Sequence, residues 1–266
     1  MQKGIKFRIY PNREQQKLIN QTLGCCRLIY NKGLAMRNEA YENGRKVGFS
    51  QTSAMLTELK RSDAFAFLKA VDSIALQQSL RDLDRGFVNF FRKRAAHPIF
   101  KSKHNRHQSY RTVNQGDNIR IAGKYIKLPK LGYVKIRQSM EVGKIKNVTI
   151  EHTPTGKYFA VLNVEFEPQP RPNKGGRIGI DVGIKEFYSD SNGNVVSNPK
   201  YLEKTMRKLI REQRKLSRKQ KNSNNRNKQR VKVASVHEKI ANQRNDFLQK
   251  QSTLLIRENQ TICIED

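Results

Sequence analysis

The chain has 266 residues, and its 53 Lys and Arg against 23 Asp and Glu give a net charge of +30. Because such an excess repels itself in a compact state unless a polyanion neutralises it, the composition favours nucleic acid as the partner, ahead of an anionic membrane surface. It excludes a binder of small neutral ligands. Without a long apolar run or an apolar leader, we expect no membrane partner and a cytoplasmic protein. Three cysteines, Cys25, Cys26 and Cys263, support neither a disulfide framework nor a zinc site.

The first 98 residues combine one strand with several helices. Residues 3–10 alternate apolar and basic side chains, which predicts a strand with one basic face. Asn12 then caps a helix in which Cys25 and Cys26 fall on the apolar positions, so we interpret both thiols as core residues. Two further helices are predicted, over residues 52–61 and 73–94.

The third helix has an apolar stripe with basic residues behind it. Phe87, Phe90 and Phe91 could stack on bases, but their helical spacing favours a place in the core. We therefore predict a helical insert with basic outer faces over residues 12–98.

Residues 100–111 form a basic, polar segment with little to bury. Its candidate nucleic-acid contacts are Lys101, Lys103, Arg106, Tyr110 and Arg111. Short segments with glycine-containing turns follow, a pattern typical of a small antiparallel barrel that the first strand could join. The predicted strands cover residues 118–121, 125–128, 133–136, 148–152 and 158–167.

Proline and glycine mark a linker over residues 169–176. Beyond it, residues 177–187 predict an apolar strand with Asp181 at its centre. A carboxylate there must be desolvated, which is costly unless a metal ion or a cation compensates. The alternative is an edge-strand aspartate that faces solvent. Gly183, two residues later, would let backbone or a phosphate approach closely.

Positive charge is most concentrated in residues 203–232, which contain 13 Lys and Arg against two acidic residues. We predict basic helices over 199–258, interrupted at 223–227, that hold nucleic acid through its backbone. The alternative is a solvated face. The candidate contacts in this half are Lys185, Arg207, Lys208, Arg211, Arg214, Lys215, Arg218 and Arg244.

A last apolar segment, residues 261–266, places Glu265 at the end of a predicted strand. If this strand neighbours that of Asp181, the two carboxylates converge and can bind Mg²⁺ through oxygen while the ion keeps waters. Two-metal phosphodiester cleavage normally needs a third ligand.

Short stretches along the whole chain resemble the TnpB (OrfB) proteins of bacterial insertion sequences, a transposase class related to the type V CRISPR nucleases. The order and number of the stretches make the resemblance specific. They are FRIYP at 7–11, GCCRLIYN at 24–31, PIFKSK at 98–103, QSYR at 108–111, LPKLG at 128–132, GIDVGIKEF at 179–187, HEKIANQRNDF at 237–247 and IED at 264–266.

The resemblance implies an RNA-guided DNA endonuclease. A guide RNA from the transposon end pairs with one strand of double-stranded target DNA, and a RuvC-type domain cuts with two Mg²⁺ ions. Asp181 and Glu265 match the first and second RuvC carboxylates, which implies catalytic and metal-binding roles. The implied fold class is α+β multidomain, a small antiparallel β-barrel interrupted by a helical recognition insert and followed by an incomplete ribonuclease-H-like (RuvC) α/β domain. The expected ranges are 1–11 for the first barrel strand, 12–98 for the insert, 99–168 for the rest of the barrel, 169–176 for the linker and 177–266 for the partial nuclease domain.

Family members continue beyond the Ile-Glu-Asp segment into a zinc ribbon and a third carboxylate, whereas this sequence ends at Asp266. Asp266 alternates with Glu265 along a strand, so it does not replace the third ligand. We therefore expect a truncated member that does not cleave DNA alone. The alternatives are a non-cleaving RNA- or DNA-binding protein, a decayed transposon remnant or a general basic RNA-binding protein.

Overall fold

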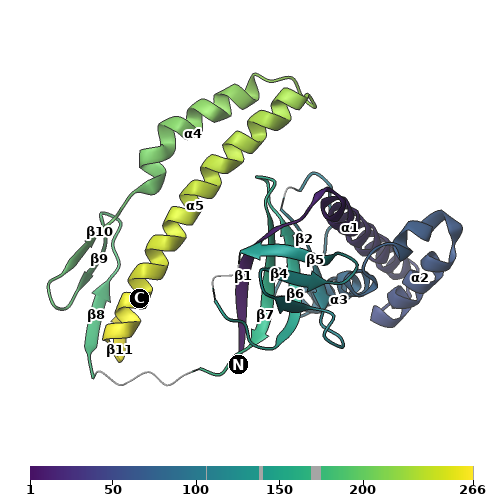
Figure 1. The fold of residues 1–266 in the computed structure, drawn as a ribbon, viewed down its shortest axis with the longest axis horizontal. Coiled ribbons are helices and arrows are strands. Elements are labelled where there is room, and N and C mark those ends of the chain that lie inside the picture. Colours follow the sequence, from purple (N-terminus) through teal and green to yellow (C-terminus); the bar gives the residue numbers. More distant parts are fainter. Residues whose placement is uncertain (106, 138–139, 169–174, 266) are drawn as a thin grey trace. The chain divides into compact units, whose positions relative to one another are not determined.

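The computed structural model describes residues 1–105, 107–137, 140–168 and 175–265. The chain divides into two compact units, Met1–Pro168 and Gln169–Asp266 (Figure 1). Each unit has its own hydrophobic core. The predicted linker lies mainly outside the described residues, which resume at Gly175. The two units are described in turn.

The first unit contains one strand, a group of helices and then six strands. The helices are α1 (Arg13–Glu42), α2 (Phe49–Arg61), the 3-10 helix η1 (Asp63–Lys69) and α3 (Ser73–Phe91). The strands are β1 (Gln2–Tyr10), β2 (Gln108–Val113), β3 (Arg120–Ala122), β4 (Tyr125–Leu128), β5 (Gly132–Arg137), β6 (Ile145–His152) and β7 (Tyr158–Glu165).

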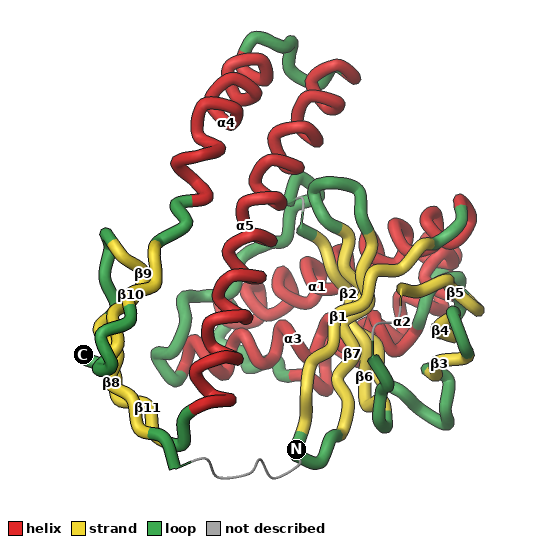
Figure 2. Tube along the Cα trace, turned by 60° about the vertical axis from the view of Figure 1, so that its left-hand side comes forward, coloured by secondary structure: helices red, strands yellow, loops and turns green. Residues whose placement is uncertain are grey.

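These seven strands form one sheet (Figure 2), in the order β2-β6-β7-β1-β5-β4-β3. Every neighbouring pair is antiparallel. Strand β1 joins this sheet, as the sequence indicates that it could, and lies between β7 and β5, so the helices are inserted between strands of a single sheet. The predicted barrel is a curled, open sheet in the residues described, because β2 and β3 occupy its two edges.

Side-chain caps fix where the helices of this unit begin. The Asn12 side chain accepts a hydrogen bond from the Gln15 backbone N–H, and the Gln15 side chain accepts one from the Asn12 N–H, which makes a reciprocal capping box. Asp72 caps α3 by accepting from the Ile74 N–H at 2.9 Å. The capped helices then pack their apolar sides on one face of the sheet.

The core confirms the interpretation of the adjacent cysteines and corrects that of the phenylalanines. Cys25 and Cys26 are buried on α1, and burial raises the pKa of the Cys26 thiol above its ordinary range. Phe87 is buried, but Phe91 is 72% exposed, so the core prediction for Phe91 is wrong. The cause is its position as the last residue of α3, where the helix leaves the packed part of the unit.

The basic segment before the barrel strands is more ordered than predicted. Residues 108–113 form the edge strand β2, which pairs with β6. Tyr110 and Thr112 alternate into the core, and Arg111 forms an ion pair with Asp82 of α3 at 2.5 Å. The strand pattern is weak because one of the two residues that point into the core, Thr112, is polar, which explains why the sequence indicates a loop there.

The second unit consists of a small sheet and two long helices. Its elements are β8 (Arg177–Asp181), β9 (Glu186–Asp190), β10 (Val195–Ser197), α4 (Tyr201–Ser217), α5 (Asn224–Glu258) and β11 (Thr261–Ile264). The strand order is β10-β9-β8-β11, with β8 and β11 parallel and the other pairs antiparallel.

Two boundaries in this unit differ from the prediction. Residues 177–187 are not one strand, because β8 ends at Asp181 and the chain turns before β9 begins at Glu186. The helical break lies earlier than predicted, since Ser223 caps α5 by accepting from the Arg226 N–H. The polar residues after Ser223 are therefore the first turn of α5.

The two long helices pack against each other along an apolar seam. Leu209 of α4 meets Val233, Val236 and Ile240 of α5 in this unit's core cluster. At the sheet end of α5, the Phe187 ring lies 4.9 Å from the Phe247 ring, measured between centroids, in edge-to-face geometry. In the described residues, no helix is both long and apolar enough to cross a membrane.

Candidate metal centre and nucleic-acid interface

Asp181 and Glu265 lie at the same edge of the second sheet, meaning the end at which the parallel strands β8 and β11 finish. Ile180 of β8 is the register partner of Ile264 of β11, and the two strands are parallel. Each carboxylate is the next residue beyond this pair, at the carboxyl end of its strand. Because side chains alternate along a strand, Asp181 leaves the sheet on the face opposite Ile180, while Glu265 directly follows the last residue of β11. The convergence predicted from the sequence therefore depends on a strand pairing that the structure contains.

The surroundings of Asp181 differ from the prediction. Asp181 is exposed at the end of β8, so it is not a carboxylate desolvated within an apolar strand. The apolar character of the segment comes from Ile178 and Ile180, whose side chains are buried on the other face. Glu265 is also exposed. This exposure leaves room for an ion that keeps part of its water shell.

The turn after β8 brings a basic residue to the same edge. Gly183 lies against its own turn, since a Cβ there would be 3.1 Å from the Glu186 carbonyl oxygen. Lys185 is exposed in this turn. Asn198 holds the turn by donating from Nδ2 to the Ile184 carbonyl at 3.0 Å. The edge thus presents two carboxylates and one ammonium.

Asp190 has a structural role at the next hairpin. It accepts from the backbone N–H groups of Asn192 and Asn194, both at 2.9 Å, and from the Asn194 side chain. The hydrogen bond from the Asn194 side chain, followed by those backbone bonds, holds the pKa of Asp190 below its ordinary value. Among the described residues, no group of three or more His, Cys, Asp and Glu side chains is arranged to hold a metal ion.

A basic groove follows the seam between α4 and α5. Its volume is about 360 Å³, and its lining includes Lys208 and Lys215 of α4 and Lys232 and Lys239 of α5. A second hollow of about 400 Å³ continues from Lys215 and Lys232 toward Arg218 and Lys219. We call this surface the helical groove and define it by its basic residues, which are Lys208, Lys215, Arg218, Lys219, Lys232 and Lys239. Such a row of cations suits the evenly spaced charges of a phosphate backbone.

One buried carboxylate organises the helical groove. Glu212 accepts from Gln229 Nε2 at 2.7 Å, and the Gln229 amide also donates to the Glu212 carbonyl at 3.1 Å. Lys215 lies 3.4 Å from the same carboxylate. The hydrogen bond from Gln229, with Lys215 as a smaller contribution, lowers the pKa of Glu212. Glu212 thereby joins the two helices and remains charged.

The remaining predicted contacts of the second unit are exposed on the helices. They are Arg207, Arg211, Arg214 and Arg244. The sequence prediction omitted Lys232 and Lys239, which face Lys208 and Lys215 across the helical groove. Their spacing of seven residues on α5 repeats the spacing of Lys208 and Lys215 on α4, and this shared period is the signal that could have identified them.

The residues predicted to contact nucleic acid in the first unit differ in their exposure and in their partners. Tyr110 is 7% exposed in the core, so a contact with nucleic acid at this ring conflicts with the fold, because a buried ring cannot stack on a base. Arg111 is engaged with Asp82. Lys103 is exposed, and Arg106 lies outside the described residues.

Lys101 is exposed as a residue, but its ammonium turns inward. The Nζ atom lies 4.0 Å from the centroid of the Tyr30 ring. Asn31 fixes the backbone here by donating to the Lys101 carbonyl at 2.9 Å and accepting from its N–H at 2.8 Å. Burial lowers the pKa of Lys101, while Asp82 acts in the opposite direction. Lys101 is therefore oriented by the fold rather than displayed to a ligand.

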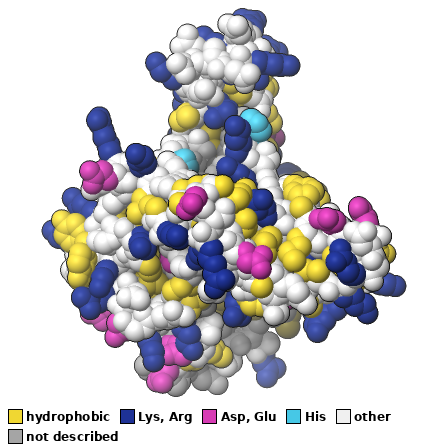
Figure 3. Space-filling model, turned by 90° about the vertical axis from the view of Figure 1, so that its right-hand side faces the viewer, with side chains coloured by type: hydrophobic (Ala, Val, Ile, Leu, Met, Phe, Trp, Pro, Cys, Tyr) yellow, Lys and Arg dark blue, Asp and Glu magenta, His cyan; other side chains and the backbone are white. Residues whose placement is uncertain are grey.

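Basic side chains are not confined to the second unit. Figure 3 shows Lys and Arg, in dark blue, spread across the face that it presents, with fewer acidic groups and patches of hydrophobic side chains between them.

Comparisons with known proteins place these features in a family. A transposase family described as "Probable transposase" matches residues 154–266, and a companion family described as "Helix-turn-helix domain" matches residues 1–46. In this structure, residues 1–46 contain β1 and the continuous helix α1.

Two curated relatives match nearly the whole chain. A putative RNA-guided DNA endonuclease from Streptomyces pristinaespiralis is 39% identical over 270 residues, covering 100% of this chain and 67% of that protein. The putative RNA-guided DNA endonuclease InsQ from Escherichia coli K12 is 37% identical, covering 99% of this chain and 65% of InsQ. The chain thus spans about two thirds of the length of these relatives.

Among solved structures, a CRISPR-Cas12f ternary complex aligns with 96% of this chain and 63% of that chain, at 12% identity and a TM-score of 0.41. The Streptomyces pristinaespiralis relative is 39% identical and is covered over 67% of its length, which shows the family of this chain. The chain belongs to the TnpB (OrfB) family of insertion-sequence transposases and RNA-guided endonucleases.

Proposed function

We propose that the chain binds a guide RNA from the transposon end together with double-stranded target DNA, and that Asp181 and Glu265 are Mg²⁺ ligands of a RuvC-type cleavage site. The proposal includes action in the cytoplasm, where chromosomal DNA is accessible. The observation behind it is the parallel pairing of β8 with β11, which puts both carboxylates at one sheet edge. The relatives named as RNA-guided DNA endonucleases support the reaction class.

The donor set fits magnesium. Two carboxylates on exposed strand ends offer hard oxygen ligands without enclosing the ion, which suits a cation that keeps several waters. Bound Mg²⁺ would polarise a phosphoryl oxygen and favour a nucleophilic water. Asp181 and Glu265 would hold the ion at a fixed edge, and Lys185 in the adjacent turn would attract the scissile phosphate.

A local cleavage experiment tests the metal site independently of nuclease activity. Fe²⁺ replaces Mg²⁺ at oxygen-ligand sites and, with ascorbate and peroxide, cuts the polypeptide near the bound ion. We expect a fragment that ends near Asp181, lost in Asp181→Ala and in Glu265→Ala. Asp246→Asn, an exposed carboxylate on α5 paired with Lys250, is the matched control and should retain the fragment. An unchanged fragment in both site variants would contradict the assignment.

Binding of nucleic acid is assigned to the helical groove. Exchanging Lys208, Lys215, Lys232 and Lys239 for Gln should weaken binding of an RNA–DNA heteroduplex. The slope of log affinity against log salt should also become shallower, by about 0.9 for each phosphate that the protein no longer neutralises. A control variant with four exposed lysines of the first unit exchanged for Gln, Lys46, Lys69, Lys93 and Lys124, separates this effect from loss of overall charge. Equal slopes in the two variants would mean that the helical groove is a solvated face.

We infer further that the 266 residues bind a target without cutting it, since two carboxylates fall short of the ligands that two metal ions normally need. Purified chain with transposon-end RNA should shift a matching DNA but leave supercoiled plasmid uncut in Mg²⁺. Mg²⁺-dependent linearisation that Asp181→Ala abolishes would show instead that these residues suffice for cleavage.

A further inference from the structure

One face of the seven-stranded sheet packs on the helices, and the opposite face carries aromatic and basic residues on β1, β3, β4 and β5 and at Phe159. Phe7 and Ile9 of β1 point into the core, so Lys6, Arg8 and Tyr10 point the other way. Strand register then identifies which residues of the neighbouring strands share this outer face.

The register produces cross-strand rows in which rings and cations lie side by side. Tyr10 is the partner of Lys135, and Lys135 is the partner of Tyr125. Arg8 pairs with Arg137 on one side and Phe159 on the other. A third row continues across the β3–β5 end of the sheet and contains Arg120, Lys127 and Tyr133. We call these residues, Lys6, Arg8, Tyr10, Arg120, Tyr125, Lys127, Tyr133, Lys135, Arg137 and Phe159, the sheet platform.

The tyrosines of the sheet platform are not explained by packing. Tyr10, Tyr125 and Tyr133 are 43%, 47% and 50% exposed, on three strands that are neighbours in the sheet. Single exposed apolar residues are normal on protein surfaces, but these three exposed rings lie on adjacent strands and share one face of the sheet. Side chains in a sheet stand roughly perpendicular to it, so these rings can meet planar ligands from one direction.

Cations contact the rings of Tyr10, Tyr133 and Phe159. The Arg8 guanidinium lies 5.1 Å from the centroid of the Tyr10 ring, and Lys6 Nζ lies 4.6 Å from that of Phe159. Arg120 Nη2 donates to the Tyr133 hydroxyl at 3.3 Å. Rings ordered in this way lose little conformational entropy when a ligand stacks on them.

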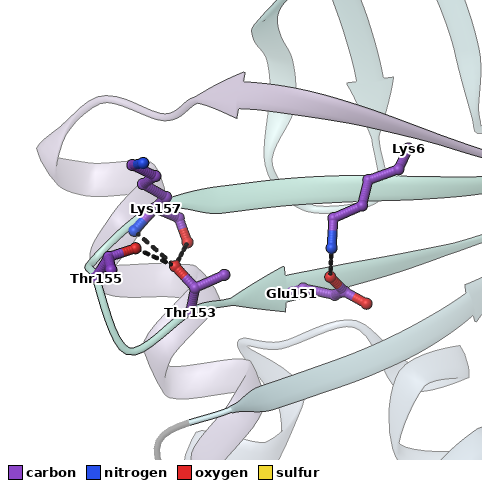
Figure 4. A network of polar contacts seen from close by, with 5 residues as sticks. All are labelled: Lys6, Glu151, Thr153, Thr155 and Lys157. Carbon is purple, nitrogen blue, oxygen red and sulfur yellow. Dashed lines mark hydrogen bonds and ion pairs between the residues drawn. The ribbon is translucent and has the colours of Figure 1, made fainter. Parts of the chain in front are cut away.

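The platform remains cationic despite one carboxylate in its rows. Glu151, the partner of Phe159 on β6, is neutralised by Lys6, whose Nζ lies 2.6 Å from the carboxylate oxygen (Figure 4). Glu165, on the outer side of β7, lies at the far end of that strand and pairs with Lys146 at 2.6 Å. The platform's charge therefore complements a polyanion.

We propose that the sheet platform binds an unpaired segment of RNA, with bases stacked on Tyr10, Tyr125 and Tyr133 and phosphates on Arg8, Lys127, Lys135 and Arg137. The inference rests on the proposed function, in which guide RNA is the ligand, and adds the part of the RNA that is recognised and the residues that bind it. Unpaired bases are required because a duplex hides its base faces within its own stack. The helical groove, by contrast, offers cations without exposed rings.

The test uses the full chain and three labelled 12-nucleotide probes of mixed sequence: single-stranded RNA, single-stranded DNA and duplex RNA. Tyr10→Ala/Tyr125→Ala/Tyr133→Ala should weaken binding of single-stranded RNA at least about 10-fold, since each stacked base contributes appreciably to affinity. Duplex affinity and the salt slope should remain within about twofold of the wild type, because every cation that meets a phosphate is still present. The corresponding triple Phe variant should restore binding.

Tyr41→Ala is the matched control, because Tyr41 is 82% exposed at the end of α1 and lies outside the sheet. It should leave all three affinities unchanged. A second measurement does not depend on whether the triple variant folds. RNA containing 2-aminopurine should lose fluorescence on binding wild-type protein, because stacking on a ring quenches it.

The outcomes separate the inference from the proposed function. If the wild type binds duplex RNA and single-stranded RNA but shows no 2-aminopurine quenching, or the triple Ala variant loses duplex affinity equally, the sheet platform is not a stacking surface and the proposed function stands. Tighter binding of single-stranded DNA than of RNA would also overturn the choice of RNA. If the wild type binds none of the probes, both proposals fail.

Discussion

Tyr110 illustrates how one side chain can resemble a ligand contact in the sequence and belong to the core in the fold. It sits in a basic segment, yet strand pairing with Ile150 turns its ring inward. Burial raises the pKa of its phenol above the ordinary range, because the charged form would have to leave water. The same strand presents Arg111 outward, where Asp82 neutralises it.

A substitution distinguishes the two roles of Tyr110. Tyr110→Leu should lower the free energy of unfolding by about 1–3 kcal/mol, the usual range for a disturbed core position, and leave RNA affinity within about twofold. Urea unfolding and a filter-binding titration measure the two quantities. Tyr41→Leu, at an exposed position, should change neither. Loss of RNA affinity with stability preserved would instead place the Tyr110 ring at the ligand.

His152 gives the first unit a pH dependence of predictable sign. Its ring stacks on Tyr158 at 4.5 Å, and burial lowers the imidazole pKa below its ordinary value. At a pH between the lowered pKa of the folded chain and the ordinary pKa of the unfolded chain, the imidazole is protonated mainly in the unfolded chain. The free energy of unfolding therefore rises with pH in this interval. The contribution is complete above about pH 6.5, the ordinary pKa of histidine, and decreases as the pH falls toward the lowered folded value.

We therefore expect urea midpoints of the first unit to fall on acidification below about pH 6.5. The decrease should be smaller in His152→Gln. His237→Gln, exposed on α5, should behave as the wild type. An identical pH profile in His152→Gln would mean that other groups cause the acid sensitivity.

At the scale of elements, α1 and α3 approach closely because a glycine lies between them. A Cβ at Gly33 would be 2.9 Å from Leu80 Cδ2 and 3.0 Å from Leu83 Cδ2. Both leucines are fully buried, so neither can swing away. The helix spacing therefore depends on the absence of a side chain at one position, which a periodicity argument does not detect.

Two glycines on one helix make this dependence measurable. Gly33→Ala should destabilise the first unit by about 1–3 kcal/mol, because overpacking outweighs the gain in helix propensity. Gly24→Ala is the control, since its Cβ would meet Arg27 Nη2 at 4.0 Å, the nearest neighbour found. That variant should be stabilised by up to about 1 kcal/mol. The interpretation is contradicted if thermal melts show the same sign for both variants.

At the scale of the whole molecule, the net charge of +30 is a property that no single element explains. Mutual repulsion opposes the compact state, and salt screens it over a distance of about 10 Å at 0.1 M. A polyanion would neutralise the same charges by binding the folded chain. Stability and ligand binding are thus coupled through electrostatics.

This coupling predicts opposite salt effects for the free and the bound chain. Without nucleic acid, the melting temperature should rise between about 50 and about 300 mM NaCl, because repulsion is screened. With bound RNA it should fall over the same range, because the complex dissociates. Differential scanning fluorimetry, with sucrose as a non-ionic control, measures both. A free chain indifferent to salt would show that its charges are too well dispersed to repel.

The sequence by itself determined the strong positive charge, the long helices and the burial of Cys25 and Cys26, because these follow from composition and from the period of a helix. It indicated that the first strand could join the later ones. It also identified Asp181 and Glu265 as a pair, conditional on their strands being neighbours. The resemblance to the family was likewise visible in the sequence, because it depends on the order of short stretches along the chain.

Only the tertiary structure decided which surfaces face outward together. Strand register between segments distant in sequence decides the exposure of Asp181, the burial of Tyr110 and the rows of the sheet platform. Pairing of α4 with α5 decides that Lys232 and Lys239 lie opposite Lys208 and Lys215. Periodicity fixes which side of an element a residue occupies, whereas pairing of elements fixes what that side meets.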